Sequence, residues 1–101
     1  MILEVAILNV RHGECDAFEQ AFREAAPIIA SMPGYHTHEL RLCIENPGRY
    51  ILLVHWRRLE DHTVGFRQSP EYQQWRALLH HFYDPFPTVE HYSDPIVATT
   101  A

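Results

Sequence analysis

The chain has 101 residues, of which 47% are hydrophobic, and a formal net charge of −5. This length supports one domain over residues 1–101 with a modest core, and the lack of any basic cluster excludes a surface that binds nucleic-acid phosphates. All eight cationic side chains are Arg, so a Schiff-base lysine and a Walker-type phosphate lysine are also excluded.

The first predicted elements are a strand and a helix. Residues 2–10 are rich in branched apolar side chains at both odd and even positions, which is typical of a strand covered on both faces. From residue 15 to residue 32, apolar side chains recur at spacings of three and four, and Pro33-Gly34 follows. This pattern predicts an amphipathic helix that ends before the proline.

A hairpin, two helices and a last strand are predicted next. Residues 35–45 and 49–58 read as strands around the turn signal Asn46-Pro47-Gly48, and residues 59–66 predict a short helix. Ser69 suits the N-cap of another helix, with Pro70 at its first position. Residues 88–93 then predict a short strand.

This β-α-β-β-α-β order is that of a ferredoxin-like α+β domain, in which helices cover one face of an antiparallel four-stranded sheet. The first and third strands are apolar on both parities, so the second sheet face also needs a cover. A second copy of the sheet, packed across a two-fold axis, is the simplest cover. We therefore predict a homodimer.

The two cysteines and the N-terminal segment indicate the cellular compartment in which the protein is expected. Cys15 and Cys43 are too few and too far apart to indicate a disulfide framework. The N-terminal run lacks a basic flank, a small-residue cleavage site and the length of a membrane span. We expect a cytoplasmic protein that does not bind a membrane.

The stretch from Tyr50 to Tyr92 carries a resemblance to a known family. Trp56 ends an apolar strand, Glu60-Asp61-His62 opens a short helix, and Val89-Glu90-His91-Tyr92 closes the domain. With the order of elements, these features resemble the antibiotic biosynthesis monooxygenase family of dimeric α+β barrel proteins. The resemblance extends over almost the whole chain and implies the same barrel, formed by two subunits.

The resemblance implies an oxygenase that needs no cofactor and acts with O₂ on a small apolar or aromatic molecule, such as a quinol. An electron-rich phenol can reduce O₂ once it is deprotonated, so the protein must supply a base, an apolar cavity and donors for the anionic oxygen. Whether the protein is catalytic stays open. The alternative from another class is a non-catalytic barrel that binds a small molecule or serves a stress response.

Two residues are predicted to carry the chemistry. His62 stands where the family often has histidine and is the expected base; its structural alternative is a local cap or hydrogen bond. Asn9 shares a strand face with Leu3, Val5 and Ile7. A buried amide must be hydrogen bonded, so Asn9 either donates to the developing oxyanion or fixes the neighbouring backbone.

A second set of residues is predicted to contact the substrate. These are Trp56 and Tyr72 as cavity walls, with Phe66, Trp75 and His55 as further contacts. The aromatic side chains have the helical spacing of an ordinary core, and His55 lies in an apolar run that suits a hydrogen-bonded core histidine, so the structural alternative stays open for each. His36 and His38 share a strand face, but no third ligand is identifiable, and no metal site is predicted.

Haem degradation, known in another branch of the family, is a weaker alternative. That branch has an Asn on the first strand, which Asn9 matches, a Trp in the short helix, and a His ligand on the last helix. Here the Trp position falls near Gly65 or Phe66 and the ligand position falls near Arg76. Arg does not ligate iron because it stays protonated, although His80 and His81 lie one turn later.

Overall fold

Strands and helices follow one another in the order predicted for a ferredoxin-like domain. The computed structural model describes residues 1–100. The main elements are β1 (Ile2–Asn9), α1 (Cys15–Ala30), β2 (Tyr35–Leu42), β3 (Arg49–Trp56), α2 (Pro70–Leu79) and β4 (Val89–Tyr92). Two short helical segments, η1 (Asp61–Phe66) and η2 (His80–Phe82), stand before and after α2. The expected α+β fold class is confirmed.

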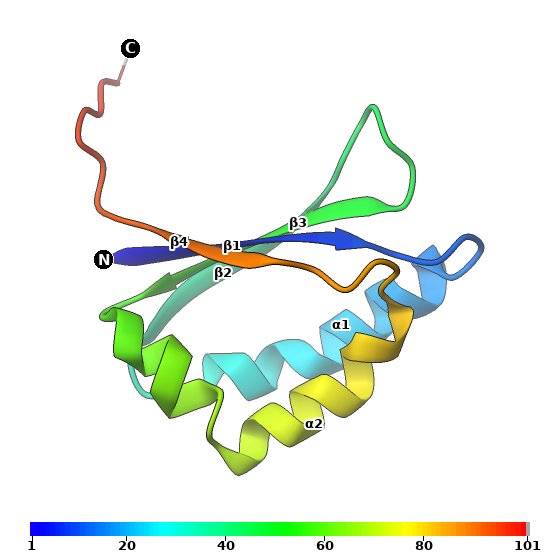
Figure 1. The fold of residues 1–101 in the computed structure, drawn as a ribbon, viewed down its shortest axis with the longest axis horizontal. Helices are drawn as coiled ribbons and strands as arrows, with labels where there is room; N and C mark the ends of the chain where they lie inside the picture. Colours follow the sequence, from blue (N-terminus) through cyan, green and yellow to red (C-terminus); the bar gives the residue numbers. More distant parts are fainter. Residues whose placement is uncertain (101) are drawn as a thin grey trace.

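The four strands form one antiparallel sheet in the order β2-β3-β1-β4. Both long helices lie on one side of this sheet (Figure 1). In the β1–β3 pair, Ala6 stands opposite Leu52 and Val5 stands opposite Leu53. Because side chains alternate along a strand, the first pair points to the helices and the second pair points to the other face.

The core lies between the sheet and the helices. The sheet contributes buried side chains such as Leu8, Val54 and Trp56, and α1 contributes Phe18, Phe22, Ala25 and Ile29. These side chains follow the strand and helix periods noted in the sequence. Within residues 1–100, no helix is both long enough and apolar enough to cross a membrane.

The segment between β3 and α2 orients the residues of the site. The predicted short helix is present, but Asp61–Phe66 forms a π-helix, in which the Arg67 amide donates to the His62 carbonyl at 3.1 Å. The Asp61 carboxylate accepts a hydrogen bond from the Arg58 amide at 3.1 Å and holds the start of this segment. The predicted N-cap of α2 is confirmed, since the Ser69 hydroxyl accepts from the Tyr72 amide at 3.1 Å.

Candidate active site between the sheet and the helices

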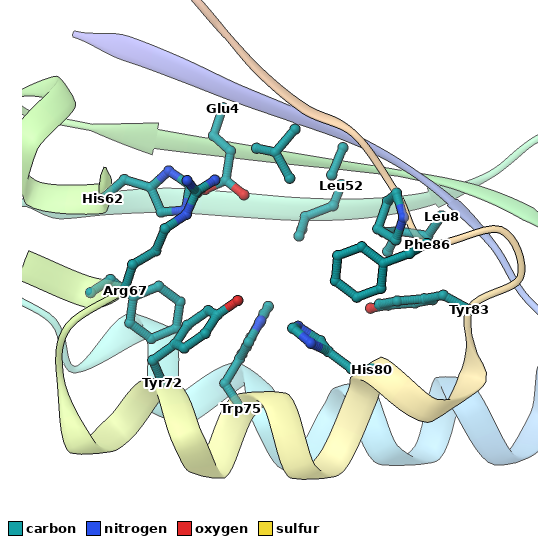
Figure 2. A pocket seen from close by; sticks show the side chains of 14 residues that line it. Glu4, Leu8, Leu52, His62, Arg67, Tyr72, Trp75, His80, Tyr83 and Phe86 are labelled. Carbon is teal, nitrogen blue, oxygen red and sulfur yellow. Dashed lines mark ion pairs between the residues drawn. The ribbon is translucent and has the colours of Figure 1, made fainter. Parts of the chain in front are cut away.

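A cavity of about 440 Å³ lies between the helix-facing side of the sheet and the segments from η1 to β4. Its wall is mainly aromatic, with side chains from η1, α2 and the segment after α2: Phe66, Tyr72, Trp75, Tyr83 and Phe86. Figure 2 shows Glu4, His62 and Arg67 together at one end of the cavity, and Tyr83 and Phe86 at the other. The cavity therefore has a polar end and an aromatic end.

Glu4 and His62 form the buried core of the polar end. The two residues are only 5% and 4% exposed, and the Glu4 Oε1 atom lies 3.3 Å from His62 Nε2. The Trp56 indole N–H donates to the same carboxyl oxygen at 2.9 Å. The indole also stacks on the His62 ring, with centroids 5.3 Å apart and planes inclined by 18°. Trp56 thus fixes both groups.

Burial shifts the pKa values of these two groups in opposite directions. The pKa of Glu4 rises from 4.5 to about 7, mainly through desolvation, although the Trp56 hydrogen bond and the charge of Arg67 oppose the rise. The pKa of His62 falls from 6.5 to about 3, first through desolvation and then through the charges of Arg67 and His91. Near neutral pH, Glu4 is therefore present in both its protonated and its ionised form, while His62 is neutral.

His91 extends this polar group toward the edge of the sheet. Its position on β4 is directly opposite Glu4 on β1, so the two residues share the helix-facing side. The His62 Nδ1 atom lies 2.7 Å from His91 Nε2, within hydrogen-bond distance. His91 is partly exposed, and desolvation followed by the charge of Arg67 lowers its pKa.

The structure places four of the seven predicted site residues on the cavity wall: His62, Phe66, Tyr72 and Trp75. Trp56 is not on the wall itself but lies behind it, against His62 and Glu4. His62 and Trp56 therefore meet at the polar end, although Trp56 is not the cavity wall that the sequence analysis expected.

Asn9 and His55 lie on the other face of the sheet. The Asn9 side-chain oxygen accepts a hydrogen bond from Arg49 Nε at 3.2 Å, and His55 Nδ1 lies 3.2 Å from the Thr37 hydroxyl. Strand alternation explains this, because both residues occupy positions that point away from the helices. The placement gives no support to a role for either residue in this cavity.

Several cavity residues were missed in the sequence, above all Glu4. It stands two residues before Ala6 and four before Leu8 on β1, so the period of two already placed an acidic residue on the face that the helices cover. His80 is the second omission. It lines the cavity beside Phe86, with ring centroids 5.0 Å apart, and burial and the charge of Arg76 lower its pKa.

Comparison with known proteins shows the family to which the chain belongs. The family model described as antibiotic biosynthesis monooxygenase matches residues 1–78. The chain belongs to this family. The Bacillus subtilis (strain 168) protein YczJ, which is uncharacterised, is 58% identical over 94 residues, covering 93% of this chain and 99% of YczJ.

Solved structures of other antibiotic biosynthesis monooxygenase proteins share the fold. A candidate family member from Bordetella bronchiseptica has a TM-score of 0.89 at 35% identity, covering 94% of this chain and 97% of that one. SnoaB from Streptomyces nogalater, a cofactor-independent oxygenase, has a TM-score of 0.69 at 20% identity, covering 89% of this chain and 86% of its own. The SnoaB likeness concerns the fold alone.

Proposed function

We propose that this family member is a cofactor-independent monooxygenase that oxidises a phenol- or quinol-type aromatic molecule in the sheet–helix cavity. The observation that carries the proposal is the Glu4 carboxyl, buried at the polar end of an aromatic-walled cavity with its pKa raised to about 7. A general base works best when its pKa lies near the operating pH. Family membership supports oxygenation as the reaction class.

In this proposal Glu4, and not His62, takes the proton from the substrate. With a pKa of about 3, His62 is a poor proton acceptor at neutral pH, whereas Glu4 is ionised in a large share of molecules. The His62 ring contacts the Glu4 carboxyl and serves to position it. The sequence-based hypothesis gave the role of base to His62, and the buried pair supports giving this role to Glu4 instead.

The remaining cavity groups suit an anionic aromatic intermediate. The Arg67 side chain reaches the polar end beside Glu4 and His62 (Figure 2), where its charge stabilises a phenolate or enolate oxygen. The flat ring system would lie between Tyr72, Trp75 and the sheet. Exclusion of water from such a cavity favours transfer of an electron from the substrate anion to O₂.

The reaction balances without any further reductant. In an anthrone-type substrate, a CH₂ carbon loses two protons and four electrons and becomes a C=O carbon. O₂ accepts the four electrons; one oxygen atom enters the product and the other leaves as water with the two hydrogens. The radical pair formed after the first electron transfer joins into a carbon-bound peroxide, and loss of water from this peroxide gives the ketone.

Oxygen uptake with anthrone as the probe tests the proposal. We expect the parent protein to accelerate uptake over buffer, with a rate that rises through an apparent pKa near 7. Glu4→Gln keeps the shape but removes the base, and should lower the rate by about 100-fold or more. His12→Ala, in an exposed loop outside the cavity, is the matched control. Equal rates for the parent and Glu4→Gln would reject Glu4 as the base.

A second candidate function is binding of an aromatic molecule without turnover. It is favoured by the aromatic wall, which would bind a flat ring system whether or not a reaction follows. Trp75 lines this wall and is 6% exposed, so quenching of its fluorescence should report binding. Quenching by anthrone together with oxygen uptake no faster than in buffer would select this function.

Haem handling is the weaker candidate, and one observation bears on it. Arg76 is exposed on α2, whereas His80 lines the cavity with its pKa lowered, so its imidazole is neutral at pH 7 and one ring nitrogen carries a lone pair that can ligate iron. Bound haem would supply iron that activates O₂, and His80 is the residue that would hold it. A Soret shift on adding haem that disappears in His80→Ala would select this function.

A further inference from the structure

Three ionisable side chains form a line from the cavity to the sheet edge. Glu4 and His62 are buried, and His91 on the edge strand β4 is partly exposed. The contacts along the line are 3.3 Å from Glu4 Oε1 to His62 Nε2, and 2.7 Å from His62 Nδ1 to His91 Nε2. Both ring nitrogens of the middle residue are therefore engaged, one on each side.

In a neutral imidazole, the two hydrogen bonds of the ring must run in the same direction along this line. One ring nitrogen carries a hydrogen and donates, while the other accepts. If His62 donates to His91, it must accept from a protonated Glu4; if it donates to an ionised Glu4, it must accept from His91. The same three side chains thus have two hydrogen-bonded arrangements, which differ by the shift of one proton along the whole line.

We propose that His62 and His91 form a proton relay that connects the Glu4 carboxyl in the cavity with solvent at the edge of β4. The proposal rests on the function proposed above for Glu4 as the base. His62 passes protons and does not store them, and His91 is the residue that exchanges protons with water. Neither histidine needs to touch the substrate, so both act as positioning and relay residues.

The proton balance of each step is defined. The outward transfer starts from protonated Glu4: its proton moves from Oε1 to His62 Nε2, the proton on His62 Nδ1 moves to His91 Nε2, and His91 Nδ1 releases one to water, which leaves Glu4 ionised and able to take the substrate's proton. Each hydrogen bond then points the other way, toward Glu4. That arrangement is the one needed later, because a proton must return to the cavity when the peroxide oxygen leaves as water.

The groups around the relay favour passing a proton over holding one. Desolvation, and after it the charge of Arg67, disfavours a charged imidazole at His62, whose pKa is about 3, so the two transfers at that ring should be concerted. On the other side of the ring, Trp56 stacks on His62 and donates to Glu4 Oε1. The indole fixes the ring plane, which keeps both nitrogens in line with their partners.

The first test is oxygen uptake in dilute and concentrated imidazole buffer, with anthrone as the probe. His91→Ala should lower the rate by about tenfold or more in dilute buffer, because the exchange with solvent is lost, and concentrated imidazole should restore it. His91→Gln, which keeps a hydrogen-bonding group but cannot pass a proton, should behave in the same way. Glu24→Gln, on the exposed side of α1, is the matched control. A loss of rate that imidazole does not restore would assign His91 a purely structural role and overturn the relay.

The second test does not need turnover. Nitrogen NMR of the imidazole rings should show that Glu4→Gln changes both the tautomer of His62 and the titration of His91, and that His62→Phe uncouples His91 from Glu4. If His91 titrates identically in the parent and Glu4→Gln, the relay is wrong. If the coupling is present but no oxygen is consumed with anthrone, the relay stands and the proposed reaction fails.

Discussion

Glu4 and His62 are two ionisable side chains that meet inside an apolar core. An isolated charge there would cost several kcal/mol in lost hydration, so each group responds by favouring its neutral form. The Glu4 pKa rises to about 7 and the His62 pKa falls to about 3. Below neutral pH the stable arrangement is therefore a protonated acid hydrogen bonded to a neutral imidazole, and not an ion pair.

This raised pKa predicts how stability depends on pH. Folded Glu4 binds its proton more tightly than unfolded Glu4, so its contribution is fully present below about pH 4.5 and is lost as pH rises through about 7. Glu4→Gln lacks this dependence. Relative to the parent, the variant should therefore gain about 3 kcal/mol in free energy of unfolding across that window.

Denaturant unfolding of both proteins at a series of pH values measures the difference. The His62 contribution runs in the opposite direction, rising as pH increases from about 3 to about 6.5, but it is present in both proteins. A difference between parent and variant that stays constant with pH would show that Glu4 keeps an ordinary pKa in the folded protein.

The sequence predicted part of this site because some signals are local. Phe66, Tyr72 and Trp75 were found from their spacing and His62 from the family resemblance, and all four line the cavity. The contact between His62 and His91 could not be found in this way. It joins residues 29 apart, and it exists only because β4 pairs with β1 while η1 folds against the same edge of the sheet.

At the scale of elements, η1 connects the sheet to the cavity. Its π turn places His62 against Glu4 and Phe66 against Trp56, and both residues of η1 are buried. The sequence predicted a short helix here but not its type. An α-helix bonds residues four apart and a π-helix bonds residues five apart, and over only six residues the two give the same pattern of apolar side chains. Such π turns occur often at functional sites.

Gly34 controls where η1 begins. Its φ is +85°, and a methyl group on its Cα would overlap the Asp61 side chain, which starts the π-helix. Gly34→Ala should therefore be destabilised by about 2 kcal/mol or more, from backbone strain and the clash together, and should displace His62 from Glu4. Urea unfolding measures the first effect, and the NMR titration of His62 measures the second.

Gly13→Ala is the matched control for this prediction. Gly13 has a similar φ of +80°, but among residues 1–100, its two chain neighbours aside, no heavy atom lies within 4 Å of the added methyl group. It should show the backbone strain alone, on the order of 1–2 kcal/mol, with His62 unaffected. Equal losses in the two variants, with His62 unchanged in both, would show that Asp61 moves aside without consequence for the site.

At the scale of the whole molecule, the sheet face opposite the helices carries apolar side chains that the helices do not bury. Val5 and Leu53 stand side by side at its centre, and both are only partly buried in the single chain. Ile7 on the same face is 39% exposed. A continuous apolar strip of this kind on a small domain favours association, and a second copy meeting it across a two-fold axis would present a matching strip.

We therefore expect a homodimer at micromolar concentration, formed through this face. Leu53→Arg would place an unpaired charge at the centre of the interface and should convert the protein to a monomer, because an unpaired buried charge costs several kcal/mol. Gln20→Arg, which adds the same charge on the exposed side of α1, should leave the dimer intact. Light scattering distinguishes the two states, and a monodisperse parent monomer would refute the expectation. Asn9 lies on this same face, where it would stabilise the dimer and would not contact a substrate in the cavity. Asn9→Ala should therefore weaken association in light scattering and leave the Glu4 titration unchanged.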